Sequence, residues 1–266
     1  YILVFKGSEI SYRSIKIVRK LNIKILNYNL DHPFKYFSKG SGNKFVKESI
    51  PYYNYHITYS KEIKKQLKEI YKINAFYLPF GYELEESEFQ QLKLKSSNSE
   101  VLRACFIGNP DTHRAEIIDK LVNDKIKIDV YGKDWKNFLK GNSYLRIFDQ
   151  VNDELYWKNL AKYRVQLNIF RPHNYNSHNM RTFEVPAIGG IMIAPKSFEH
   201  SLFFDQNSDC FFYSDYENLS KKIKKILEMS YHEINNIRKN AREKSVKNKY
   251  SYYHLTKQLL TYLKKI

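Results

Sequence analysis

The sequence lacks the signatures of several common protein classes. It has only two cysteines, Cys105 and Cys210, each inside an apolar segment, which indicates buried, reduced thiols and no disulfide framework. No apolar run approaches the ~18 residues that a membrane-spanning helix requires. The sequence shows no low-complexity segment and no repeat of fixed period. With 42% hydrophobic residues among its 266, the chain can still bury a core, so we expect one large domain or two modest ones.

Standard nucleotide-binding, hydrolase and metal motifs are also missing. No Gly-x-Gly-x-x-Gly, Walker-type or Gly-x-Ser-x-Gly motif follows an apolar strand, which argues against a dinucleotide oxidoreductase, a P-loop NTPase and a serine hydrolase. The nearest glycine-rich run, "KGSGNK" at 39–44, lacks the third glycine. No Asp-x-Asp pair or metal-ligand spacing occurs, so we expect no metal and no cofactor. A diphosphate ligand would then need backbone amides, helix N-termini and Arg or Lys.

The chain carries a large excess of positive charge. Its 45 Lys and Arg residues against 28 Asp and Glu give a formal net charge of +17. The lysines are scattered over the polar faces of predicted helices, and no nucleic-acid-binding motif is present, so we expect no specific nucleic-acid partner. A positive field would still attract nucleotide diphosphates and anionic membrane surfaces. We therefore expect a cytoplasmic protein that associates peripherally with the anionic inner face of the membrane.

Apolar segments that predict β-strands alternate with segments of helical periodicity, in two series. The first series comprises residues 1–7, 23–30, 52–60 and 75–81, and the second comprises 103–108, 127–132, 144–149, 164–170, 189–195 and 209–215. This alternation is typical of βαβ units and parallel sheets. The polar stretch 90–100 between the two series predicts a linker. Three residues, Asp111, Asn152 and Asp215, have the character of helix N-caps.

Loops that follow parallel strands are where ligands bind in such folds, and one of them is unusually polar. It is "RPHNYNSHNMRTFE", residues 171–184. After another strand, Gly108 lets a phosphate approach the backbone, and Arg114 follows in the first turn of a helix. Arg114 could contact that phosphate or be an ordinary solvated arginine.

The segment "NMRTFEVPAIGG", residues 179–190, places polar and charged side chains at the start of a predicted helix. Its first amides and Arg181 could receive an anion. The carboxylate of Glu184 could accept hydrogen bonds from a ribose diol, or it could simply be favoured by the helix dipole. The small residues at 186–190 indicate that this helix packs closely against the strand that follows.

Several segments together resemble the spore-maturation CgeB-like glycosyltransferases of the GT-B group. They are "YLPFGYE" (77–83), "ACFIGN" (104–109), "VYGKDW" (130–135), "NMRTFEVPAIGG" (179–190) and "YSYYHLTKQLL" (250–260). The resemblance implies an α/β protein of two Rossmann-like domains with a cleft between them, the first lacking its opening strands. The expected domains are 1–95 on the acceptor side and 96–250 on the nucleotide-sugar side. A helix at 251–266 would pack back toward the first domain.

The resemblance also implies roles for individual residues. Glu184 would hold the donor ribose, Arg114 the diphosphate, and the backbone from Phe148 to Val151 the nucleobase. The full set of expected donor-binding residues is Gly108, Asn109, Arg114, Phe148, Arg171, Asn179, Arg181, Thr182 and Glu184. The wider retaining GT-B group often has a second glutamate eight residues before the first, a position occupied here by Asn176.

The function expected from these features is metal-independent transfer of a sugar from a nucleotide-diphosphate sugar to a hydroxyl of a glycan, lipid-linked or protein acceptor. Retention of configuration is favoured over inversion, with the donor phosphate assisting and no dedicated base. An inverting enzyme would need a base, for which Asp31 or His32 is a candidate. The "DHP" sequence that contains them is also typical of a turn, and we favour the turn over the base. The alternative is a non-catalytic GT-B-like module that binds an anionic polymer or a partner.

Overall fold

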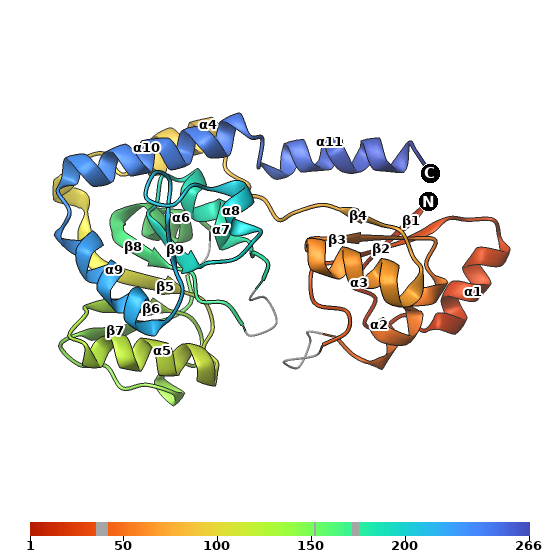
Figure 1. The fold of residues 1–266 in the computed structure, drawn as a ribbon, viewed down its shortest axis with the longest axis horizontal. Helices are drawn as coiled ribbons and strands as arrows, with labels where there is room; N and C mark the ends of the chain where they lie inside the picture. The colour runs from red at the N-terminus through yellow and green to blue at the C-terminus, as the bar shows by residue number, and fades with distance from the viewer. Residues whose placement is uncertain (36–41, 152, 172–175) are drawn as a thin grey trace. The chain divides into compact units, whose positions relative to one another are not determined.

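The computed structural model describes residues 1–35, 42–151, 153–171 and 176–266, which form two compact units (Figure 1). The first unit consists of Tyr1–Phe80 together with Leu255–Ile266, and the second is Gly81–His254. Each unit contains one parallel sheet, and each of the predicted strand segments overlaps a strand of one of these sheets. The α/β class that the alternation predicts is therefore confirmed.

The first unit has a four-stranded sheet of order β1-β2-β3-β4. Its strands are β1 (Ile2–Phe5), β2 (Ile25–Asn29), β3 (Tyr55–Thr58) and β4 (Ala75–Tyr77). Its helices are α1 (Tyr12–Lys20), α2 (Lys44–Ser49), α3 (Lys61–Tyr71) and most of α11 (Tyr252–Leu263). The end of α11 is fixed to the sheet, because the Tyr262 ring stacks on Phe76 with centroids 4.8 Å apart and its hydroxyl donates to the Tyr77 carbonyl.

The second unit has a six-stranded parallel sheet of order β10-β9-β8-β5-β6-β7. Its strands are β5 (Val101–Ile107), β6 (Ile128–Tyr131), β7 (Leu145–Phe148), β8 (Tyr163–Leu167), β9 (Met192–Pro195) and β10 (Phe211–Tyr213). The strand order reverses beside β5, where β6 and β8 pair with its two sides. Such a reversal opens a crevice at the carboxyl ends of the strands.

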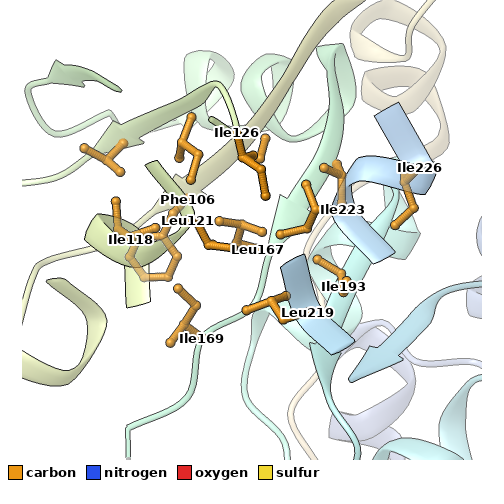
Figure 2. Packing of buried hydrophobic residues seen from close by; sticks show 14 of the residues in the cluster. Phe106, Ile118, Leu121, Ile126, Leu167, Ile169, Ile193, Leu219, Ile223 and Ile226 are labelled. Carbon is orange, nitrogen blue, oxygen red and sulfur yellow. The ribbon is translucent and has the colours of Figure 1, made fainter. Parts of the chain in front are cut away.

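Helices flank this sheet and bury a continuous apolar core against it (Figure 2). They are α4 (Glu86–Leu92), α5 (Thr112–Asn123), α6 (Asp153–Lys162), α7 (Arg181–Ala187), α8 (His200–Phe203), α9 (Tyr216–Glu228) and α10 (Tyr231–Lys247). Phe106 from β5, Leu121 from α5 and Ile223 from α9 meet in the core. Two of the predicted caps, Asp111 and Asp215, accept backbone N–H bonds at the starts of α5 and α9. The third, Asn152, lies outside the described residues.

The segment predicted as a linker, 90–100, belongs to the second unit, and so do residues 81–95, which the prediction placed in the first. The reason is a set of contacts between α4 and α10. Arg242 lies 4.2 Å from the ring centroid of Phe89 and pairs with Glu86. Tyr82 also forms a backbone bridge with Ser251. The division between the units therefore falls at Phe80 and Gly81.

No helix among the described residues is long and apolar enough to cross a membrane.

A buried carboxylate on one strand of the second sheet bonds side chains from three other strands. Asp129 on β6 is fully buried and accepts hydrogen bonds from Arg103 on β5, Arg146 on β7 and the Tyr163 hydroxyl on β8. A buried charge is tolerated only when it is paired and hydrogen-bonded, as it is here.

Asp129→Ala should therefore destabilise the second unit by about 3–5 kcal/mol, because it leaves two guanidinium groups without their shared carboxylate. The matched control is Glu243→Ala, which removes an exposed i,i+4 partner of Lys239 and should cost only ~0–1 kcal/mol. Denaturant unfolding of both variants checks this. Equal midpoints would show that the Asp129 cluster contributes nothing to stability.

Candidate functional site

The candidate site lies at the carboxyl edge of the second sheet, where the loops after β5 and β6 touch. Gly108 follows β5 with φ +153°, in a region that side chains rarely adopt. The indole N–H of Trp135 donates to the Gly108 carbonyl over 2.8 Å, which holds this loop against the loop after β6.

Arg181, the first residue of α7, reaches across Gly108. A Cβ built on Gly108 would lie 2.7 Å from the Arg181 Nη2 atom, so glycine leaves the space that this guanidinium occupies. The Arg181 Cζ atom also lies 5.5 Å from the ring centroid of Phe106, within cation–π range. Its Nε atom is buried and has no acceptor among the described residues. This arrangement joins the glycine and the arginine that the sequence marked separately.

Arg114 is buried against the loop after β5. Its side chain is 9% exposed, and three of its five N–H groups donate to the carbonyls of Asn109 and Ile169. Burial, and next the charge of Arg181, lower the pKa of Arg114 to about 10. Arg114 thus ties the loop after β5 to the chain beyond β8. Its direct role at a diphosphate stays a prediction.

The charge around these arginines is unbalanced. Asp111 lies 3.6 Å from the Nε atoms of both Arg114 and Arg171, and Arg181 is near enough to depress the pKa of Arg114. The Asp111 carboxylate thus pairs with two guanidinium groups, and Arg171 and Arg181 are partly exposed. An anion bound here would offset the remaining positive charge.

Asn179 and Thr182, both predicted to bind the donor, are used within the protein. Thr182 is fully buried, accepts the Asn179 N–H and bonds His200. The Asn179 side chain exchanges hydrogen bonds with Asn168 and accepts the Thr182 N–H. Their polar atoms hold the start of α7 in place, because a helix start needs acceptors for its free N–H groups. Both residues thus support α7, and their contact with a donor stays a prediction.

Gly190, just after α7, allows close packing against α6, whereas the predicted close packing against the following strand stays a prediction. A Cβ on Gly190 would lie 2.8 Å from the carbonyl oxygen of Leu160.

Glu184 lies one turn into α7, and its carboxylate accepts a hydrogen bond from the Tyr156 hydroxyl of α6 at 2.5 Å. Burial raises the pKa of Glu184, while this hydrogen bond and the charge of Arg181 act in the opposite direction. Glu184 as a whole is partly exposed. The helix dipole does not account for the specific partner on α6. Sequence reasoning missed Tyr156, since nothing in its helix distinguishes it from a packing aromatic.

Phe148 ends β7 at the same edge of the sheet and is 37% exposed. Its ring stacks on Tyr131 with centroids 4.7 Å apart and planes 13° from parallel. The described geometry provides a flat aromatic surface of the kind on which a nucleobase stacks. The exposed Asn109 lies in the loop after β5, where its Oδ1 atom accepts the Lys133 N–H.

Asp31 and His32 follow β2 in the first unit. The Asp31 N–H donates to the Asn29 side chain, and the His32 Nδ1 atom accepts the Phe34 N–H. Asp31 also pairs with Lys6. The chain bends at these residues, and each side chain already has a structural partner, while the choice between a turn and a catalytic base stays open.

A buried cluster of three polar residues near α7 was not predicted from the sequence. His178 and Ser177 both bond the Glu199 carboxylate, and all three are buried. Burial lowers the pKa of His178, while its bond to Glu199 acts in the opposite direction. Within the described residues, no group of three or more His, Cys, Asp and Glu side chains is arranged to hold a metal ion. Part of the "KGSGNK" run, 39–41, lies outside them.

Comparison with solved structures identifies the fold. TarM superposes with a TM-score of 0.68 at 13% identity, over 90% of this chain and 50% of that chain. Anabaena HepE in complex with UDP-glucose superposes with a TM-score of 0.70 at 10% identity, over 100% of this chain and 79% of that one. An alpha-glucosyltransferase in complex with UDP-glucose and DNA containing an abasic site gives 0.65 at 13% identity, over 98% and 79%. The protein therefore has the GT-B fold with two Rossmann-like sheets, and it spans half the length of TarM.

The chain belongs to the glycosyl transferase-like family, whose model matches residues 114–261. No curated protein is significantly similar to it in sequence. The narrower resemblance to the CgeB-like group stays a prediction.

The raised pKa of Glu184 predicts a pH-dependent cost to stability. A carboxyl whose folded pKa lies above its usual 4.5 holds its proton more tightly in the native state, so the wild type loses stability as pH rises from 4.5 through the folded pKa. Glu184→Gln cannot ionise, and its stability relative to wild type should increase over that window. Denaturant unfolding of both proteins between about pH 4 and pH 8 measures the difference.

Glu243→Gln, at an exposed residue of the same unit, is measured in parallel as the control. A constant difference between Glu184→Gln and wild type would contradict the raised pKa.

Proposed function

We propose that the protein transfers a sugar from a nucleotide-diphosphate sugar to an acceptor hydroxyl, and that it binds the donor in the second unit. Membership of the glycosyl transferase-like family and the GT-B fold support this reaction class. The observation that carries the proposal is the convergence of Gly108, Arg181 and Glu184 at the carboxyl edge of β5 and β8, beside a surplus of guanidinium groups.

In this proposal the donor diphosphate lies against the loop after β5. Arg181 and Arg171 supply its charge-assisted hydrogen bonds, and the glycine at 108 allows close approach to the backbone. Arg114 supports the loop from beneath, with its own donors on the carbonyls of Asn109 and Ile169. In this proposal the partly exposed Arg171 and Arg181 contact the diphosphate, and the buried Arg114 positions the loop.

We place the ribose and the nucleobase at the same edge of the sheet. Glu184 accepts hydrogen bonds from the ribose hydroxyls through the oxygen that Tyr156 does not occupy. Tyr156 keeps the carboxylate in one orientation and reduces its burial cost. The ring of Phe148, already stacked on Tyr131, supports the nucleobase by stacking.

The reaction itself breaks the bond between the sugar and the diphosphate and forms a bond to the acceptor oxygen, whose proton must be removed. We favour retention, with a donor phosphate oxygen taking that proton, since Asp31 and His32 already have structural partners. The diphosphate charge is met by arginines, so the proposed donor binding needs no metal ion. The acceptor is a hydroxyl of a glycan, a lipid-linked molecule or a protein.

Arg181→Ala should weaken UDP binding by roughly 10–150-fold, because it removes charge-assisted bonds worth ~1.5–3 kcal/mol. UDP is the probe because UDP-glucose is bound in the structure of HepE. Calorimetric titration of the wild type and the variant measures the change.

Lys224→Ala is the matched control, since it removes one positive charge from an exposed site on α9 of the same unit. UDP affinity should be unchanged in this variant. Equal affinities for wild type and Arg181→Ala would refute the assignment of the diphosphate to Arg181. If the wild type binds no nucleoside diphosphate from a panel of UDP, GDP, ADP and dTDP, the non-catalytic module becomes the better account.

UDP affinity should also be the same in EDTA as in Mg²⁺ or Mn²⁺, because guanidinium groups rather than a cation neutralise the diphosphate. The same titration in the three buffers tests this. Binding that disappears in EDTA and returns with Mn²⁺ would overturn metal independence while leaving the site itself in place.

A further inference from the structure

A groove of about 890 Å³ lies between α4 and α10 in the second unit. Residues of both helices line it, and the residues after α4 and α7 complete its walls. Its volume falls within the ~300–1,000 Å³ of small-molecule sites. No part of the proposed donor site lines it.

The groove has an apolar wall. Phe89 and Leu94 come from α4 and the segment after it, Ile188 follows α7, and Tyr231 and Val246 belong to α10. Val246 is 48% exposed, whereas Phe89, Leu94 and Tyr231 are half-buried. Aliphatic and aromatic carbon is thus accessible along the length of α10.

Positive charge surrounds this wall. Four lysines, Lys93, Lys95, Lys239 and Lys247, line the groove. Its two carboxylates are engaged, because Glu86 pairs with Arg242 at 2.7 Å and Glu243 lies 3.8 Å from Lys239. Within the described ranges, Lys93, Lys95 and Lys247 form no ion pair.

A buried charge adds to this surplus. Arg238 lines the groove, is 5% exposed, and shares the single carboxylate of Glu100 with the buried Arg164. Two of its nitrogens, Nε and Nη1, have no hydrogen-bond acceptor in the described part of the chain. Two buried guanidinium groups on one carboxylate leave one positive charge uncompensated, which is costly unless an anion lies near.

We propose that this groove binds an anionic phospholipid and so attaches the second unit to a membrane surface. The apolar wall contacts the lipid body, and the lysines surround its phosphate. Lysine suits such a role, since it is a mobile point charge on a flexible stem, and each lysine near an anionic surface strengthens attachment. The net charge of +17 adds long-range attraction to that surface. This proposal does not depend on the sugar-transfer reaction.

The test is co-sedimentation of the full chain with vesicles of phosphatidylglycerol and phosphatidylcholine, compared with vesicles of phosphatidylcholine alone. Binding is expected only to the anionic vesicles. The triple variant Lys93→Glu, Lys95→Glu, Lys239→Glu should bind them at least roughly 100-fold more weakly. Lys221→Glu, Lys224→Glu, Lys225→Glu on α9 makes the same change in net charge away from the groove and should lose far less.

A second variant, Val246→Asp, tests the apolar wall and should also weaken vesicle binding. Far-UV circular dichroism and denaturant unfolding of each variant verify that the second unit is folded. Equal loss in the two lysine triples, equal binding to neutral vesicles, or complete displacement by inorganic phosphate would overturn the proposal. So would binding of a synthetic acidic amphipathic peptide without binding of anionic vesicles, because the groove would then belong to a protein partner.

Discussion

The candidate site depends on glycine at residue 108, because a side chain there would leave no space for Arg181. Arg181 occupies the space that a Cβ there would fill, and it lies against the face of Phe106. Arg114 lies on the same ring and is close enough for its pKa to be lowered by Arg181. Two like charges are therefore held together before any ligand arrives. Such an arrangement costs stability in the empty protein and is compensated when an anion binds.

The helix that carries Arg181 is held by buried polar contacts rather than by its own length. Thr182 and His200 share a hydrogen bond, and Asn168 bonds Asn179, two residues before the helix. Burial lowers the pKa of His200 to about 3, so its imidazole stays neutral across the physiological range. Gly190 lets the end of the helix approach Leu160 closely. A short helix supported in this way presents its side chains in one geometry, which reduces the entropy lost on ligand binding.

Hydrophobic periodicity was sufficient to predict the strands, because buried parallel strands form short apolar runs between helical segments. It also placed Gly108, Arg181 and Glu184 at one edge of a sheet. It could not distinguish polar residues that face a ligand from those that satisfy the backbone. Asn179 and Thr182 make bonds of the second kind. Nor could it find the contacts that fix α4, because their partners on α10 lie more than a hundred residues away in sequence.

The central claim is that a nucleoside diphosphate lies on the loop after β5 beneath Arg181. A crystal structure of the protein with UDP tests this most directly. The account predicts phosphate oxygens within hydrogen-bonding distance of Arg181, and ribose hydroxyls on the carboxylate of Glu184 with Tyr156 still bound to its other oxygen. A UDP molecule bound elsewhere, with Arg181 still unpaired over Gly108 and Glu184 contacting only Tyr156, would contradict it.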